Sequence, residues 1–98
     1  MDLIENSQNS MSWKLNRILY FLENYFPGYP FHHAKDLRYF ELLLEEFHGL
    51  DIEEELKSYC AWVLDQPEDK KISYRCRFRS WLKTSVNFKS GNYYQIFR

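Results

Sequence analysis

Basic side chains between positions 70 and 83 are the strongest candidates for chemistry in this sequence. Arg75, Arg79 and Lys83 follow one another at intervals of four residues, which places them in one row along a helix, with Arg77 pointing away from the row. A guanidinium group binds phosphate through parallel hydrogen bonds and is always charged, so such a row can follow a nucleic-acid backbone. We therefore predict a nucleic-acid-binding segment over residues 70–83, comprising Lys70, Lys71, Arg75, Arg77, Arg79 and Lys83.

The distribution of charge along the chain identifies the same segment. The formal net charge is −1, but residues 1–69 contain all 14 acidic side chains and five basic ones, whereas residues 70–98 contain eight basic side chains and no acidic one. Such asymmetry can mark an interaction surface. The alternative is a solvated helix face whose charges pair with the acidic segments Glu41–Glu46 and Glu53–Glu55. The sequence leaves both open, because the choice depends on whether the acidic helices cover the basic row.

A second candidate surface consists of aromatic residues. Trp13, Arg17 and Tyr20 have helical spacing and lie outside the main apolar face of their helix. Aromatic residues and Arg are enriched at protein interfaces, so this face is a candidate for partner binding or for homodimer formation. The C-terminal tail or the loop at residues 27–33 could equally well cover it. Three tail aromatics could join the same interface or stack on nucleic-acid bases: Tyr93, Tyr94 and Phe97.

Four helices must position these residues. Apolar side chains recur with helical spacing over Ser12 or Trp13 to Tyr25, over Ala34–Phe47, between Asp51 and the stop at Asp65-Gln66-Pro67, and over Ser73–Ser85. Pro27-Gly28 ends the first of them, and Asp51 followed by Glu54 has the spacing of a capping box at the start of the third. The expected buried faces are Leu15, Ile18, Leu19, Leu22 and Phe26; Leu37, Phe40, Leu43, Leu44 and Phe47; Ile52, Leu56, Tyr59, Cys60 and Val63; and Tyr74, Phe78, Trp81 and Leu82.

The fold that this pattern predicts is all-α. Length and composition fit one small bundle of about four helices over residues 11–85, since 98 residues leave no room for a second independent core. Residues 1–10 are expected to form a flexible N-terminal arm. Residues 86–98 are expected to form an irregular aromatic tail, or a hairpin in which Val86-Asn87-Phe88 is one strand and Ser90-Gly91 the turn.

Three segments, Leu50–Leu56, Trp62–Asp65 and Tyr74–Leu82, form a longer pattern together with Pro67 and Lys70-Lys71. A helix with a Trp near its end leads through a loop with Pro and Lys to a helix that carries an aromatic residue and then Trp-Leu among basic residues. This pattern, within residues 50–85, resembles a segment of phage and prophage replication initiators and helicase loaders. The resemblance implies a role in DNA replication or in docking onto the replication machinery, and it carries over no catalytic residue.

Other functional classes lack support in the sequence. It has no nucleophile motif, no Gly-rich phosphate loop and no closely spaced ligand pair among His32, His33, His48, Cys60 and Cys76. We therefore expect no enzymatic activity, no metal, no cofactor and no small-molecule substrate. No apolar run is long enough to span a bilayer and the first ten residues are polar and acidic. These features predict a cytoplasmic protein without membrane contact, with reduced cysteines.

Overall fold

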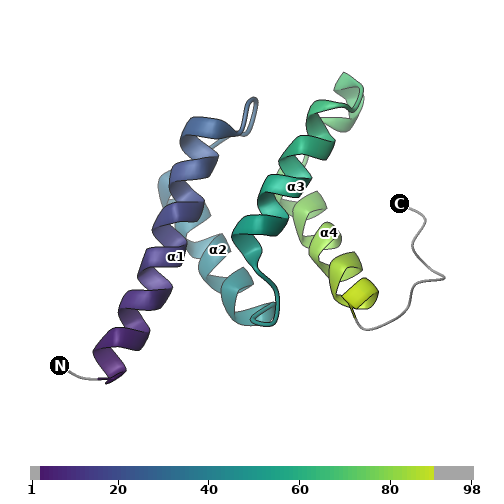
Figure 1. The fold of residues 1–98 in the computed structure, drawn as a ribbon. Helices are drawn as coiled ribbons and strands as arrows, with labels where there is room; N and C mark the ends of the chain where they lie inside the picture. Colours follow the sequence, from purple (N-terminus) through teal and green to yellow (C-terminus); the bar gives the residue numbers. More distant parts are fainter. Residues whose placement is uncertain (1–2, 90–98) are drawn as a thin grey trace. The chain divides into compact units, whose positions relative to one another are not determined.

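The helical architecture follows the apolar spacing of the sequence. The computed structural model describes the backbone of residues 3–89 and the side chains of residues 11–87. These residues form four α-helices and one short 3-10 helix: α1 (Leu3–Tyr25), α2 (His33–Glu46), α3 (Ile52–Leu64), η1 (Glu68–Lys70) and α4 (Tyr74–Lys89) (Figure 1). The part of the chain described contains no strand, and the prediction of an all-α fold of about four helices is confirmed.

The chain divides into two compact units between Glu46 and Phe47. Unit 1 (residues 1–46) contains α1 and α2, and unit 2 (residues 47–98) contains α3, η1 and α4. In each unit the second long helix runs back alongside the first (Figure 1). The division falls inside residues 11–85, which length and helix spacing predict as one helical domain.

The core of unit 1 lies along the predicted apolar faces of its two helices. All five residues of the predicted α1 face are buried, as are Phe40 and Leu43 of α2, whereas Leu37 and Leu44 are half-buried. Full burial of an aliphatic or aromatic side chain contributes about 1.5–3 kcal/mol relative to exposure. The buried residues of α1 are Leu15, Ile18, Leu19, Leu22 and Phe26.

Pro27 and Gly28 make the tight turn that ends α1. The backbone N–H of Tyr29 donates to the carbonyl oxygen of Phe26 at 3.2 Å, and Gly28 has a φ of 81°. A type II turn requires positive φ at its third residue, which glycine adopts without steric penalty, and it favours proline at its second. The predicted stop is therefore confirmed, and it turns the chain toward the start of α2.

The beginning of α1 differs from the prediction. The helix extends back to Leu3, so the predicted start at Ser12 or Trp13 is wrong, and the backbone of residues 3–10, expected as part of a flexible arm, is helical. The prediction placed the start where the apolar period begins. Each residue added to an existing helix gains a hydrogen bond without a new nucleation cost. Residues 3–10 contain no Gly or Pro that would stop this extension.

In unit 2, Asp51 caps α3 as predicted. Its backbone is extended, and its Oδ1 accepts a hydrogen bond from the backbone N–H of Glu54 at 3.1 Å. Such a cap contributes about 1 kcal/mol. The acidic segment Glu53–Glu55 occupies the first turn, at the positive end of the helix dipole.

The core of unit 2 also follows the predicted faces, with one exception. The five predicted residues of α3 are buried, as are Tyr74, Phe78 and Leu82 of α4. Trp81, expected to hold α4 on the bundle as part of the same stripe, is only half-buried. The exception is important because Trp81 lines a groove, as described below.

The end of α4 is a second difference from the prediction. The helix continues to Lys89, so the predicted strand Val86–Phe88 is wrong, and residues 90–98 of the predicted tail lie outside the described residues. Ser85 is buried and donates from its hydroxyl to Glu55 Oε1 at 2.8 Å. The contact between α4 and α3 therefore persists to Ser85, the predicted end of the helix. Apolar and polar residues alternate over only three positions after it, which is too weak a strand signal to stop a helix that has already formed.

Candidate functional site

The α3–α4 pair carries an open groove with a volume of about 490 Å³. Two aromatic residues of α3 line it, and α4 contributes an aromatic, a cationic and two hydroxyl side chains. Among the residues whose side chains are described, those that line the groove all belong to unit 2: Tyr59, Trp62, Arg77, Ser80, Trp81 and Thr84.

The aromatic side chains of the groove form one packed cluster. Tyr59, which is 2% exposed, lies at its base. Its ring stacks on that of Trp62 at 6.1 Å and meets that of Trp81 edge-on at 5.5 Å, and the two indole rings are 6.0 Å apart. Trp62 remains 38% exposed. The cluster thus combines a fixed base with aromatic surface that a ligand can reach.

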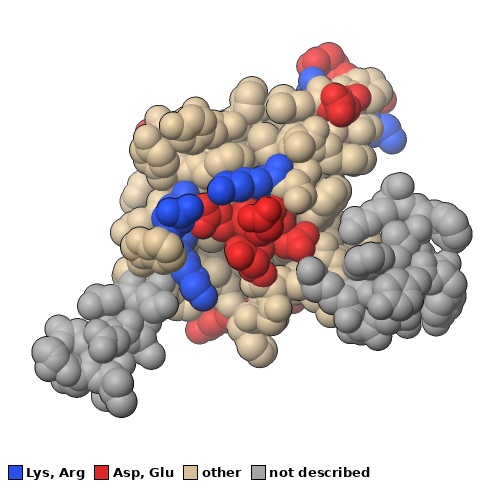
Figure 2. All heavy atoms as spheres, viewed as in Figure 1, with Lys and Arg blue, Asp and Glu red and all other residues tan. Residues whose placement is uncertain are grey.

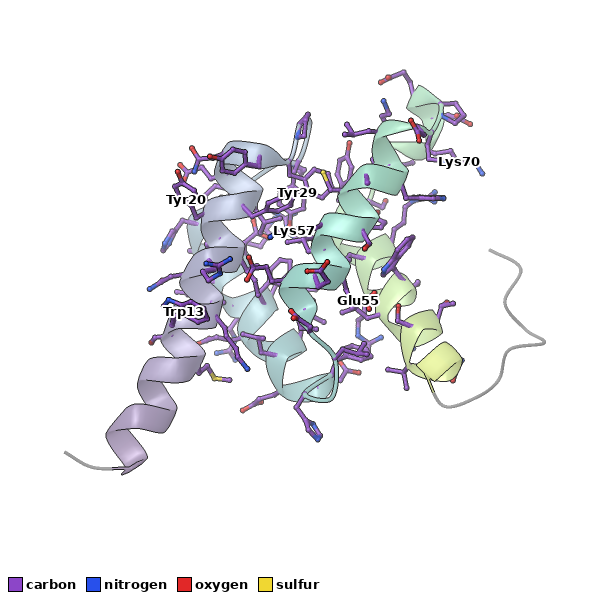
Figure 3. The ribbon with its side chains drawn as sticks, in the orientation of Figure 1. Trp13, Tyr20, Tyr29, Glu55, Lys57 and Lys70 are labelled. Atoms are coloured by element: carbon purple, nitrogen blue, oxygen red, sulfur yellow. The ribbon has the colours of Figure 1, made fainter. Side chains whose placement is uncertain are left out.

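Glu55 fixes the orientation of Trp81. The Glu55 side chain points from α3 toward α4 (Figure 3), where its Oε1 accepts hydrogen bonds from Trp81 Nε1 at 3.0 Å and from Ser85 Oγ at 2.8 Å. Hydrogen bonds to a charged acceptor contribute about 1.5–3 kcal/mol. The polar edge of the indole is therefore satisfied within unit 2 while the residue lines the groove.

Arg77 supplies positive charge to the groove. Burial raises the pKa of the Tyr59 hydroxyl to about 12, and the Arg77 guanidinium opposes that rise. Tyr59 is consequently neutral at physiological pH, and it lies within the electrostatic reach of a permanently charged guanidinium. The groove is aromatic and cationic, a combination that suits a planar or apolar group attached to an anion.

The predicted basic row, Arg75, Arg79 and Lys83, runs along a different face of α4 from the residues that line the groove. Arg75, Arg77 and Arg79 are half-buried, and Lys83 is exposed. The Arg79 guanidinium lies over the Phe47 ring, 6.0 Å from its centroid, so part of this side chain packs on an aromatic face. Arg75, Arg79 and Lys83 thus lie on successive turns of α4, and Arg77 lies on another face of the helix.

The two lysines before α4 occupy different surroundings. Lys70 ends η1 and is exposed. Lys71 is half-buried, and its Nζ lies 3.2 Å from the Glu68 carboxylate, as a hydrogen-bonded ion pair. We expect Lys70 to be more available to a ligand than Lys71, whose charge is partly compensated.

Acidic side chains gather over the beginning of α3 in the view of Figure 2. Lys57 Nζ lies 3.4 Å from a Glu53 carboxylate oxygen, four residues earlier on the same helix. Glu55 is connected to α4 through the neutral donors of Trp81 and Ser85. The acidic start of α3 thus contacts α4 through indole and hydroxyl groups as well as serving the helix dipole.

The second predicted surface lies on α1 and is exposed. Trp13 and Tyr20 are 60% and 59% exposed, and the Arg17 guanidinium lies 5.0 Å from the centroid of the Trp13 ring. Tyr20 meets Tyr25 edge-on at 5.7 Å, and a hydrogen bond with Tyr25 raises the pKa of the Tyr20 hydroxyl. The structure therefore pairs Arg17 with Trp13, and it places Tyr20 against Tyr25 further along the same helix. The other members of the prediction, Tyr93, Tyr94 and Phe97, lie outside the described residues.

A buried carboxylate at the start of α2 was not predicted. Asp36 is 0% exposed, and it accepts hydrogen bonds from the Tyr29 hydroxyl at 2.5 Å and from the backbone N–H of His32 at 2.9 Å. His32 Nδ1 in turn accepts from the backbone N–H of Lys35 at 3.2 Å. This reciprocal capping fixes the loop between α1 and α2, so the network has a structural role within unit 1.

The described side chains and helices offer neither a metal site nor a membrane-spanning segment. No group of three or more His, Cys, Asp or Glu side chains among the described residues is placed to hold a metal ion. Cys60 and Cys76 are both free thiols, and burial raises the pKa of the Cys60 thiol. Within the described part of the chain, no helix has the length and apolar character required to cross a membrane.

Comparison with known proteins yields no relative from which a function could be transferred. No protein-family model, no curated protein and no solved structure matches this chain.

The groove itself was missed by sequence reasoning. Helical spacing with Phe78 predicts that Trp81 is buried, and Trp62 is singled out only by the resemblance to replication proteins. A signal was present, because Trp62 follows Tyr59 by three residues and Trp81 follows Arg77 by four, which places each pair on one helix face. The pairing of the two helices, which brings Trp62 and Trp81 together, is not contained in either local pattern.

Proposed function

We propose that this chain is a cytoplasmic, non-enzymatic binding module that contacts nucleic acid through the cationic side chains of α4. The observation that carries the proposal is the composition of this helix, which contains no acidic residue and has Arg75, Arg79 and Lys83 on successive turns. The resemblance of residues 50–85 to phage and prophage replication proteins favours DNA as the nucleic acid and replication as its setting.

The physical basis is the match between a row of fixed cations and a phosphate backbone. Residues four apart on a helix are separated by about 6 Å along its axis, so the row formed by Arg75, Arg79 and Lys83 can meet successive phosphates. Each phosphate contact releases condensed counterions, which supplies affinity that falls steeply as salt is added. Packing of Arg79 on Phe47 restricts that side chain and lowers the entropy lost on binding.

Salt-dependent binding to a labelled oligonucleotide tests the proposal. We expect fluorescence anisotropy to show binding of DNA at about 50 mM salt and a much lower affinity at about 200 mM. Replacing Arg75, Arg79 and Lys83 together with Gln should lower the affinity at least about tenfold and reduce the salt slope by about 3. The absence of binding at low salt would overturn the proposal.

A matched control removes the same number of charges from unit 1. Lys14, Lys35 and Arg38 are exposed, and replacing all three with Gln changes the net charge by the same amount as the α4 substitutions. We expect this variant to bind DNA with an affinity close to that of the parent chain. Equal losses in both variants would show that net charge, and not the α4 row, governs binding.

A second candidate function is protein binding or homodimer formation through α1. The observation that favours it is the exposure of Trp13, Tyr20 and Tyr25, each about three-fifths exposed, since exposed aromatics of this size are typical of interfaces. Light scattering distinguishes the candidates. A dimer that is lost on Trp13→Ala would support the α1 interface, and a monomer at all concentrations would exclude the homodimer.

A further inference from the structure

We infer that the α3–α4 groove accepts one unstacked nucleobase, so that unit 2 binds single-stranded nucleic acid in preference to duplex. This inference rests on the proposed function and deepens it, because it assigns the aromatic groove a role that the basic row alone does not require. It also names the class of ligand as a single strand with an accessible base next to a phosphate.

The shape and lining of the groove suit a base. Trp62 and Trp81 provide two indole rings 6.0 Å apart over the buried Tyr59 ring, and the volume of about 490 Å³ leaves room for a planar heterocycle. Stacking on aromatic side chains tolerates every base, because each has a π face. The hydroxyl groups of Ser80 and Thr84, which also line the groove, can bond to base or sugar edges.

The charge of the groove selects an anionic ligand. Aromatic clusters also bind quaternary ammonium groups, but Arg77 lines the same space and opposes a cation. A nucleotide satisfies both the aromatic rings and the charge of the groove, because its base can stack on the rings while its phosphate pairs with Arg77.

Duplex DNA cannot use the groove in this way. Its bases are stacked and paired, and extruding one costs a few kcal/mol, so a duplex is expected to contact only the cations. An acidic protein segment could use Arg77 and the α4 row as well. It would be distinguished by competition, because a polyglutamate chain presents carboxylates without planar bases.

The test compares Trp62→Ala with the parent chain on two probes, a thymidine oligonucleotide and a duplex, both about 20 residues long. Trp62 is chosen over Trp81 because Trp81 also bonds to Glu55. We expect the substitution to weaken binding of the thymidine strand by about five- to fifty-fold and binding of the duplex by less than about twofold. Trp62→Phe should restore most of the single-strand affinity.

Leu64→Ala is the matched control on the same helix, since Leu64 is 49% exposed and does not line the groove. It should bind both probes like the parent chain. If circular dichroism shows that Trp62→Ala is unfolded, Ser80→Leu serves instead. Ser80 is exposed and lines the groove, so the larger side chain should obstruct a base and lower single-strand binding alone.

The outcomes separate the inference from the proposed function. No binding of either probe at low salt overturns the proposed function. Equal affinities for strand and duplex, with Trp62→Ala and Ser80→Leu both without effect, overturn the inference and leave the proposed function standing. Displacement of the thymidine strand by polyglutamate at equal charge concentration would show that the groove serves an acidic protein partner, which also overturns the inference.

Discussion

Each unit places a carboxylate in the first turn of a helix, and the two carboxylates are satisfied over very different distances along the chain. Asp36 in unit 1 bonds to Tyr29 and His32, which are seven and four residues away. Glu55 in unit 2 bonds to Trp81 and Ser85, which are 26 and 30 residues away. The first network closes a loop, and the second holds two helices together.

The difference shows that a carboxylate in the first turn of a helix can have two structural roles. A carboxylate near a helix N-terminus is favoured by the dipole in either unit. In unit 1 its partners are in the adjoining turn, so the network can form as soon as α2 begins. In unit 2 its partners become available only when α3 and α4 pack, and the same contact fixes Trp81 at the groove. The long-range network therefore links stability to the candidate site.

The largest expected effect is the loss of the unit 1 carboxylate. Asp36→Ala leaves the Tyr29 hydroxyl and the His32 N–H without this buried acceptor, and we expect a loss of about 3 kcal/mol in the free energy of unfolding. Urea unfolding followed by far-ultraviolet circular dichroism measures it. Tyr29→Phe removes one donor only and should cost about 1 kcal/mol. A loss of stability for Asp36→Ala that is smaller than the loss for Tyr29→Phe would contradict the structural role assigned to the hydrogen bonds of Asp36.

A smaller effect is expected in unit 2, because Glu55 is only half-buried. Glu55→Ala should lower the free energy of unfolding by about 2 kcal/mol, since buried Ser85 and the Trp81 indole lose their acceptor. Glu55→Gln retains an acceptor oxygen and should recover part of the loss. Glu54→Ala, at an exposed position of the same turn, should cost about 0.5 kcal/mol. Equal losses for Glu54→Ala and Glu55→Ala would remove the distinction between the two units.

The smallest effect concerns pH and the base of the groove. The pKa of Tyr59 is about 12 in the folded chain and about 10 in the unfolded chain. Burial of the neutral phenol therefore stabilises the fold fully below pH 10, and this contribution is lost as the pH rises through 12. Between about pH 9 and 11, the parent chain should lose about 1 kcal/mol more stability than Tyr59→Phe.

Urea unfolding at the two pH values checks this expectation. Tyr20 in unit 1 provides the comparison, because it is 59% exposed. We expect Tyr20→Phe to alter the pH dependence much less than Tyr59→Phe does. If the free energy of unfolding has the same pH dependence in the parent chain and in Tyr59→Phe, ionisation of the Tyr59 hydroxyl does not cause the loss of stability at high pH.

The buried faces of the helices were predictable because their signal is local. Ile52, Leu56 and Val63 recur with helical spacing. Asp51 followed three residues later by Glu54 has the spacing of a capping box, which predicts the start of α3. Helix ends were less predictable. Neither Leu3 nor Lys89 lies at a change of apolar spacing, so the extension of α1 and α4 beyond the amphipathic region left no local mark.

The candidate site was predicted only in part, for the same physical reason. The spacing of Arg75, Arg79 and Lys83 identified a cationic row from one helix alone. The groove needs Trp62 and Trp81 on different helices, and the hydrogen bond that orients Trp81 joins residues 26 positions apart. A local pattern marks which side chains share a face, and tertiary pairing decides which of them meet a neighbour and which remain accessible.

The proximity of Trp62 and Trp81 also gives unit 2 an optical signature of its own. Two indole rings 6.0 Å apart and inclined at 52° couple their electronic transitions, which produces a paired positive and negative band in ultraviolet circular dichroism. The chain has three tryptophans, and the third, Trp13, belongs to unit 1. The couplet therefore reports the pairing of α3 with α4 separately from α1 and α2, without any label attached to the protein.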